Sequence, residues 1–223
     1  MADKESYLRM LPTGIREPMR KMLNKIISGD INMGTLTANI TGNITGQHLL
    51  TLQSAEHGAG AIGTAFAPRT YRGYMMNGDI VTSIHVDLTG LGCNGQAAGD
   101  AIGLVTDAPP AYIGRYVVAT YGVVYKVEMI CIEAPGEGTA TITSDIMLSA
   151  DDEADIGYDG AVDGGDIVDP AGAIAAGKMY QTLIPAMTPN DYLYLTEGST
   201  EATTGVYNAG QLIINLYGHP VLS

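Results

Sequence analysis

One segment, Asp79–Gly90, constrains the fold more than any other, because its apolar residues recur at every second position. Its side chains form two sets, Ile80, Thr82, Ile84, Val86 and Leu88 on one side and Val81, Ser83, His85, Asp87 and Thr89 on the other. Successive side chains of a β-strand point to opposite faces, so the pattern predicts a strand with one buried face and one solvent face. Such a strand needs partner strands along its edges and an apolar layer against its inner face.

Further β-prone segments follow along the chain, separated by turn signals. We expect strands at residues 101–105, 112–132, 139–148, 179–184, 191–195 and 211–217. Tyr121-Gly122 is expected to divide the second of these into a hairpin, Pro135 to follow its end, and the last two strands to pair with each other. Roughly eight or more short strands with frequent turns are typical of an antiparallel β-sandwich or jelly roll. The sequence therefore predicts a mainly β protein with a sandwich-like or jelly-roll-like body.

The segment before residue 30 has a helical periodicity instead. Its apolar residues are spaced i, i+3, i+4, i+7 and i+8, which predicts a short amphipathic helix with basic residues on its flanks. The pattern leaves three interpretations open: a helix that packs on its own body, one that docks on another protein, and one that lies on a membrane surface. The candidate partner-binding residues are Arg16, Met19, Arg20, Lys21, Met22, Leu23, Ile26 and Ile27.

These patterns divide the chain into three parts: a basic amphipathic arm (1–30), a Gly/Thr-rich extended segment (31–68) and a β-sandwich body (69–223). The middle part contains the tetrad Asn-Ile-Thr-Gly twice, between residues 39 and 46. Small residues at every second position favour either an ordinary edge strand or pairing with a neighbouring subunit.

Residues 58–63, Gly-Ala-Gly-Ala-Ile-Gly, match the dinucleotide-binding fingerprint letter by letter. That fingerprint works only inside a parallel βαβ unit, and the flanking sequence has no such pattern. We therefore expect a flexible loop here.

The net charge of −13, from 24 acidic and 11 basic residues, is unevenly distributed. Six of the basic residues precede residue 26, namely Lys4, Arg9, Arg16, Arg20, Lys21 and Lys25. Nucleic-acid binding depends on Lys and Arg, so an acidic body argues against a nucleic-acid partner. Residues 149–170 are rich in Asp and Gly, and we expect a solvated surface loop there in preference to a calcium site.

The residue types needed for catalysis do not form a recognisable constellation. The four histidines, His48, His57, His85 and His219, are scattered, and neither a Gly-x-Ser-x-Gly motif nor His/Cys zinc spacing accompanies them. No pair of carboxylates is singled out for sugar hydrolysis. We expect no enzymatic activity, no cofactor and no metal.

The two cysteines, Cys93 and Cys131, are expected to be buried free thiols of a protein made in a reducing compartment. The first residues of the chain lack the apolar run of an export signal. No apolar stretch approaches the ~20 residues of a membrane span, so we expect no membrane partner.

Five segments of the body carry a family likeness: Gly78–Gly90, Ala111–Arg115, Cys131–Pro135, Tyr192–Leu195 and Ala209–Gly218. Taken together and in this order, they resemble small structural proteins from the virions of tailed bacteriophages, especially phages of aquatic bacteria. The likeness spans most of the body, and the matching segments are strands and not active-site motifs.

The resemblance implies a non-catalytic virion protein made in the cytoplasm of a bacterial host. The first expectation is a capsid decoration (cement) protein on the capsid surface, which binds the major capsid protein and itself, as a homotrimer at local three-fold axes of the shell. The second is a tail-fibre, tail or adaptor protein. A third interpretation, from another class, is a β domain that binds glycans on the host surface.

Overall fold

The computed structural model describes residues 51–52, 56–64, 66–75, 77–94, 97–137, 144–198 and 204–221. All of them belong to residues 46–223, the second of the two units into which the chain divides. The amphipathic helix predicted before residue 30 and the edge strand predicted around the two Asn-Ile-Thr-Gly tetrads lie outside the described residues. The first part of the strand expected at 139–148 lies outside them as well.

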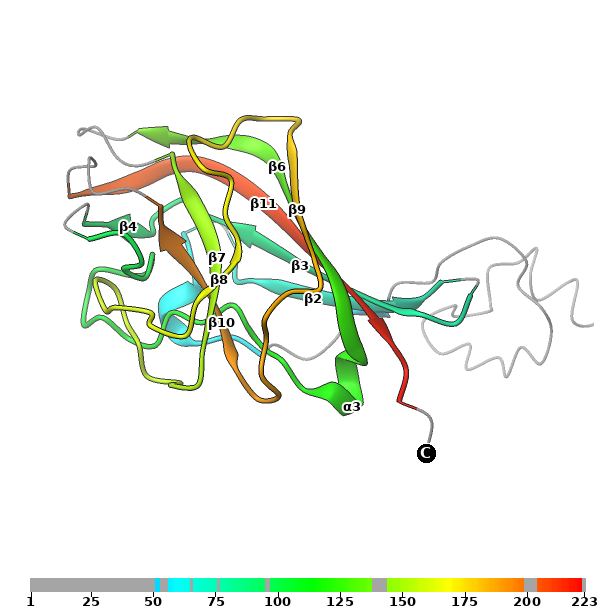
Figure 1. Cartoon of the computed structure of the whole chain (residues 1–223). Helices are drawn as coiled ribbons and strands as arrows, with labels where there is room; N and C mark the ends of the chain where they lie inside the picture. The colour runs from blue at the N-terminus through cyan, green and yellow to red at the C-terminus, as the bar shows by residue number, and fades with distance from the viewer. Residues whose placement is uncertain are drawn as a thin grey trace, which may run out of the picture. The chain divides into compact units, whose positions relative to one another are not determined.

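Two antiparallel sheets pack face to face as a sandwich (Figure 1). The large sheet contains, in spatial order, β1 (Thr51–Leu52), β2 (Arg69–Tyr74), β3 (Ile80–Asp87), β11 (Gly205–His219), β6 (Val123–Glu137) and β9 (Met179–Leu183). A further strand, β4 (Gly92–Cys93), pairs with β11 beside this path. The small sheet contains, in order, β5 (Gly114–Arg115), β10 (Tyr192–Glu197), β7 (Ile146–Asp151) and β8 (Asp166–Val168). The predicted mainly β, antiparallel sandwich is confirmed.

Helix is scarce in the described part of the chain. It consists of η2, a 3-10 turn at Ala59–Ala61, and α3, a single turn at Val118–Tyr121. Within the ranges that the structure describes, no helix is long and apolar enough to cross a membrane.

The strand predicted at residues 79–90 is β3, and its inner face is as expected, with buried side chains at Ile80, Thr82, Ile84, Val86 and the following Leu88. The prediction of a simple solvent face on the other side is wrong, because Ser83 and Asp87 are only 5% and 2% exposed. The Ser83 hydroxyl donates a hydrogen bond to Oδ1 of Asn215 on β11 at 2.6 Å. Asp87 Oδ1 accepts the backbone N–H of Thr89 at 2.9 Å. Cross-strand pairing and a local turn thus cover two polar residues that alternation alone places in water.

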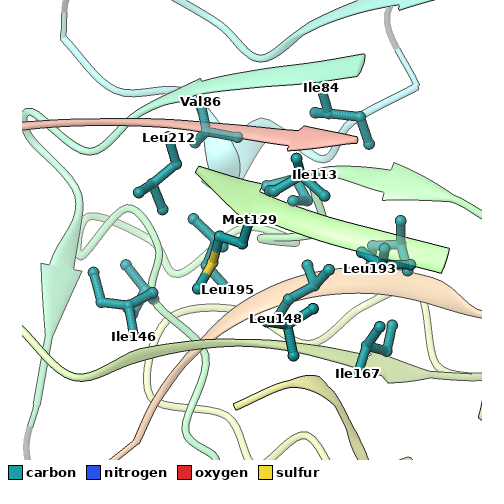
Figure 2. Close-up of a cluster of buried hydrophobic side chains, with 14 of the residues drawn as sticks. Ile84, Val86, Ile113, Met129, Ile146, Leu148, Ile167, Leu193, Leu195 and Leu212 are labelled. Atoms are coloured by element: carbon teal, nitrogen blue, oxygen red, sulfur yellow. The ribbon is translucent and has the colours of Figure 1, made fainter. Parts of the chain in front are cut away.

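The core lies between the two sheets and takes apolar side chains from both (Figure 2). Those labelled in the figure are Ile84, Val86, Met129 and Leu212 of the large sheet, Ile113 before β5, and Ile146, Leu148, Ile167, Leu193 and Leu195 of the small sheet. Each such side chain contributes about 1.5–3 kcal/mol when it is fully buried. Cys93 and Cys131 belong to the same core and are free thiols, as predicted.

The segment expected to be a hairpin at residues 112–132 is built differently. Its first half holds β5 and α3, and only its second half belongs to a long strand, β6. The break falls at Gly122, as predicted, where φ is 73° and an added Cβ would clash with the backbone of His219. The strand does not stop before Pro135 but continues to Glu137, with several shifts of register against β11. Local irregularity lets the long strand accommodate proline.

Two other strand predictions and one loop prediction are wrong. β10 and β11 do not pair with each other, because they belong to different sheets. Residues 101–105 form isolated bridges and no regular strand. Residues 149–170 are not all surface loop, since they include the end of β7 and the whole of β8. The strand predicted at 179–184 is confirmed as β9.

Residues 58–63 form a packed turn and not the flexible loop that we expected. The Gly58 N–H donates to the Tyr112 carbonyl at 2.8 Å, and the Gly60 N–H donates to the Pro110 carbonyl at 2.7 Å. A Cβ at either glycine would clash with the backbone of Pro109 or Pro110. These glycines therefore allow two chain segments to approach closely, a role that involves no nucleotide.

Candidate functional site

The partner-binding residues predicted for the arm, from Arg16 to Ile27, lie outside the described residues. The structure therefore neither brings them together nor separates them. A candidate site has to be found on the body, where three features are relevant: the outer face of the large sheet, the free edge of β9, and a pocket lined by tyrosines.

The outer face is the side of the large sheet that points away from the core. Strand register arranges its side chains in three cross-strand rows: His85, Ile213, Ile130 and Met179; Ser83, Asn215, Glu128 and Gln181; Val81, Tyr217, Lys126 and Leu183. The intervening residues on the same strands, such as Ile84, Ile214 and Met129, are fully buried in the core. The outer face thus combines polar, aromatic and aliphatic groups and becomes more apolar toward β9.

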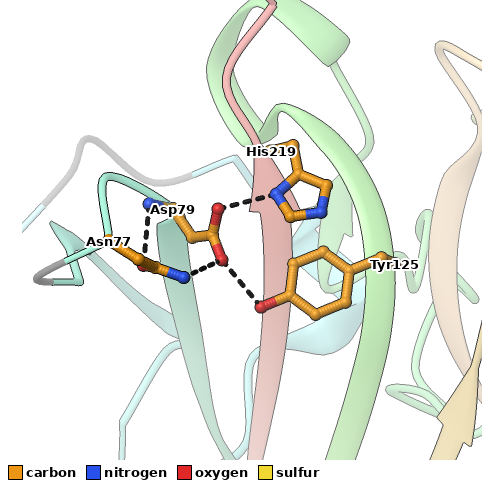
Figure 3. A network of polar contacts seen from close by, with 4 residues as sticks. All are labelled: Asn77, Asp79, Tyr125 and His219. Atoms are coloured by element: carbon orange, nitrogen blue, oxygen red, sulfur yellow. Dashed lines mark hydrogen bonds and ion pairs between the residues drawn. The ribbon is translucent and has the colours of Figure 1, made fainter.

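A hydrogen-bonded network around Asp79 ties the ends of three strands together (Figure 3). Asp79 Oδ1 lies 2.6 Å from His219 Nδ1, while its Oδ2 accepts hydrogen bonds from the Tyr125 hydroxyl at 3.0 Å and from Asn77 Nδ2 at 2.6 Å. The Tyr125 and His219 rings stack, with centroids 4.4 Å apart and an interplanar angle of 19°. The network joins the turn before β3 to the start of β6 and the end of β11.

The same contacts favour the ionised form of Asp79. Its pKa is held below the ordinary value, chiefly by the hydrogen bond with His219 and further by those with Tyr125 and Asn77, although burial acts in the opposite direction. In an acyl-transfer triad, the histidine of an Asp–His pair faces a nucleophile. Here the ring of His219 stacks on Tyr125, so we interpret the pair as a clamp at the strand ends. Sequence reasoning missed it, because only the register of β3 and β11 brings Asp79 and His219 together.

A second polar cluster lies further along the outer face. Lys126 Nζ and Glu128 Oε1 are 2.8 Å apart, and the Tyr217 hydroxyl donates to Glu128 Oε2 at 2.7 Å. The Lys126 ammonium also lies 3.9 Å from the centroid of the Tyr217 ring. Burial pushes the pKa of Glu128 upward, but the hydrogen bonds from Lys126 and Tyr217 outweigh it, and the net shift is downward. The charges of this cluster are therefore satisfied within the chain itself.

The apolar edge, our name for Ile132, Met179, Leu183 and Ile184, follows β9 and the neighbouring part of β6. These four side chains are 50%, 52%, 65% and 84% exposed, respectively. Among the strands that the structure describes, β9 is the last of its sheet and pairs with β6 alone. No charged residue occurs between positions 179 and 184, and this short uncharged run is the signal by which the sequence could have revealed the edge.

A pocket of about 250 Å³ is lined by Glu56, Tyr112, Arg115, Val117 and Tyr192. The Arg115 guanidinium lies 5.2 Å from the centroid of the Tyr192 ring and donates to the carbonyl of Asn190 at 3.4 Å and to its Oδ1 at 3.3 Å. Tyr112 packs edge-on against Tyr192, with centroids 4.9 Å apart. Aromatic rings beside a cation and a carboxylate suit a small polar ligand with one apolar face.

The acidic segment is anchored by one buried carboxylate. Asp151, which is 5% exposed, accepts backbone N–H groups from Glu153 at 2.9 Å, from Asp163 at 2.8 Å and from Gly164 at 2.9 Å. Within the part of the chain that the structure describes, no group of three or more His, Cys, Asp or Glu residues is placed to hold a metal ion. We therefore interpret Asp151 as a residue that stabilises turns.

Comparison of the chain with protein-family models, with curated proteins and with solved structures finds no match.

Proposed function

We propose that this protein is a non-catalytic structural protein of a tailed-phage virion and decorates the head shell by binding the major capsid protein. The resemblance of its strand segments supports the class. The apolar edge is the observation that carries an assembly role, since Leu183 and Ile184 are 65% and 84% exposed. Contiguous exposed apolar groups are typical of contact sites on soluble proteins.

The outer face beside this edge suits a lasting contact. Lys126, Glu128 and Tyr217 already satisfy one another by hydrogen bonds and an ion pair. A partner that covers them leaves no charge without a counterpart, and the cost of burying an unpaired charge is avoided. The adjacent aliphatic side chains then supply the favourable burial.

The charge distribution supports the same role. The excess of acidic residues in the body favours the solubility of free copies before assembly. In this proposal, the basic and apolar residues from Arg16 to Ile27 supply a second contact with the shell. The resemblance implies homotrimers at the local three-fold axes of the shell.

Binding to isolated head shells tests this proposal. The full-length chain is mixed with shells of the phage that encodes it, prepared without the protein, and the bound copies are counted by quantitative mass spectrometry of washed particles. A decoration protein reaches a copy number of the same order as the major capsid protein. A copy number limited to one or a few symmetric rings assigns the protein to the tail, its fibres or an adaptor. Absence of binding to both shells and tails refutes a virion role.

The tyrosine-lined pocket favours a second function, recognition of a glycan on the host surface. Tyr112 and Tyr192 offer aromatic rings to the apolar face of a sugar, and Arg115 and Glu56 offer a donor and an acceptor to its hydroxyl groups. Saturation-transfer NMR with a panel of monosaccharides and disaccharides tests it. Binding that is lost in Tyr192→Ala but kept in Tyr74→Ala, a substitution at a residue 66% exposed elsewhere on the body, supports the pocket. No transfer to any sugar refutes it.

A further inference from the structure

The free edge of β9 carries a row of backbone groups directed away from its own sheet. The Ile184 N–H donates to the Tyr125 carbonyl at 2.8 Å, and the Lys178 carbonyl accepts the Cys131 N–H at 2.9 Å. Hydrogen-bonded positions alternate along an antiparallel pair, so residues 178, 180, 182 and 184 face β6. Met179, Gln181 and Leu183 therefore direct their N–H and C=O groups outward. No strand of the described ranges pairs with that side.

This edge lacks the features by which soluble proteins protect an edge strand. Such edges are commonly blocked by a lysine, a proline or a bulge within the strand. Here the five residues of β9 are all uncharged, and Lys178 and Pro185 stand just outside them. The pairing of β9 with β6 runs through all five residues without a shift of register.

We propose that two copies of the chain pair through β9, antiparallel and about a two-fold axis at Gln181, which joins their large sheets into one. This register sets Met179 of each copy opposite Leu183 of the other, and Gln181 opposite its own equivalent. All three positions have outward backbone groups, so the contact forms about six backbone hydrogen bonds. It also covers the exposed Met179 and Leu183 side chains as cross-strand apolar pairs.

Charge opposes contact between two copies at most orientations and opposes it least at this edge. Each chain carries a net charge of −13, so two bodies repel each other at most orientations. The uncharged run 179–184 is a place where the chains can meet without opposing like charges directly. Added salt screens the remaining repulsion between the bodies, and the dimer is therefore strengthened by salt. This two-fold contact does not depend on the proposed virion role. It covers Met179 and Leu183, so it competes with a shell contact through that part of the apolar edge and leaves Ile132 and the outer face for the shell.

A charge-swap experiment on the full chain tests the contact. Gln181→Lys and Gln181→Glu each place two like charges opposite one another on the axis, and each should raise the dissociation constant of the dimer by about tenfold or more. An equimolar mixture of the two variants should form a heterodimer, because the charges are then opposite. Gln181 is exposed, so both variants should fold, which thermal melting verifies. Val105→Lys, at a residue 44% exposed in a loop, changes the net charge as Gln181→Lys does and should leave the dimer intact.

Sedimentation equilibrium over a concentration series, at low and at high salt, measures each species. A wild-type dimer that strengthens with salt, dissociates in both single variants and re-forms in their mixture supports the proposal. A chain that stays monomeric at its highest soluble concentration overturns it, as does an oligomer insensitive to charge at position 181. Variants that fail to associate when mixed contradict the two-fold register at Gln181. A dimer weakened by salt contradicts the argument that the two bodies repel each other, and either result overturns the proposal. A monomer that pairs only with an extended peptide of another protein assigns the edge to a foreign strand and also overturns the proposal.

Discussion

Substitution of Gly114 by alanine probes the packing between the two sheets at a single atom. Gly114 begins β5 in the small sheet, and a Cβ built there would lie 3.0 Å from Cδ1 of Ile84 in the large sheet. The next nearest atoms are Leu193 Cδ1 at 3.7 Å and the Tyr121 hydroxyl at 3.8 Å, which are ordinary contact distances. The added methyl group therefore crowds one atom of one side chain.

The expected magnitudes follow from this geometry. Overpacking a close-packed core costs about 1–3 kcal/mol, and the reduced freedom of alanine in the unfolded chain offsets about 0.4–1 kcal/mol of that. Ile84→Val removes Cδ1 and on its own costs about 0.5–1.5 kcal/mol. In the double variant, the methyl group at position 114 occupies the space that Cδ1 leaves. The double variant should thus be more stable than the sum of the single effects by about 0.5–3 kcal/mol.

Denaturant unfolding of the four proteins measures this coupling as a double-mutant cycle. Ile146→Val combined with Gly114→Ala serves as the control. Along β10, Ile146 pairs with Glu197, four residues away from the Leu193 that pairs with Gly114. The control pair should be additive. Additivity within about 0.5 kcal/mol for Gly114 and Ile84 as well would refute the described contact between the sheets.

Three further predictions concern the network, the outer face and the arm. The pKa of Asp79 is lower in the folded chain than in the unfolded one, so its contribution to stability is present above about pH 4 and is lost as the pH falls through the folded pKa. The wild type should therefore melt at a higher temperature than Asp79→Asn at neutral pH and lose this advantage in acid. A difference in melting temperature that is constant with pH contradicts the network. Ser83→Asp should destabilise the protein, because the aspartate would be buried beside Oδ1 of Asn215, which now accepts a hydrogen bond from Ser83. Ser83→Ala should cost only about 1 kcal/mol in denaturant unfolding. Met22→Glu and Ile26→Glu should abolish shell binding while leaving the melting temperature unchanged, and a fall in melting temperature would favour a predicted helix that packs on its own body.

Alternation of apolar residues was sufficient to predict the inner face of β3. Ile84 and Val86 are buried as expected, because a central strand with a core on one side enforces a period of two. Alternation could not predict the environment of Ser83, since its hydrogen-bond partner, Asn215, is distant in sequence and the register of β11 decides the contact.

Pairing between strands was the least predictable part of the fold. The apolar runs at 191–195 and 211–217 both form strands, but periodicity does not specify which sheet a strand joins. The same limit applies to Asp79 and His219, whose contact depends on the register between β3 and β11. The apolar edge, by contrast, follows from a short local run without charges, and only its place at the end of the sheet had to come from the structure.

The central position of β11 governs the order in which the sandwich can form. This strand lies between β3 and β6 and pairs with both, as well as with β4, yet it follows all three along the chain (Figure 1). During synthesis, the two halves of the large sheet emerge from the ribosome with no hydrogen bonds to each other, and each exposes an unfilled edge until β11 inserts. Completing the sheet with a strand that is distant in sequence makes folding slow and leaves an aggregation-prone intermediate. A chain truncated before residue 205 should therefore depend on chaperones, whereas the full chain, released with β11, should fold without them.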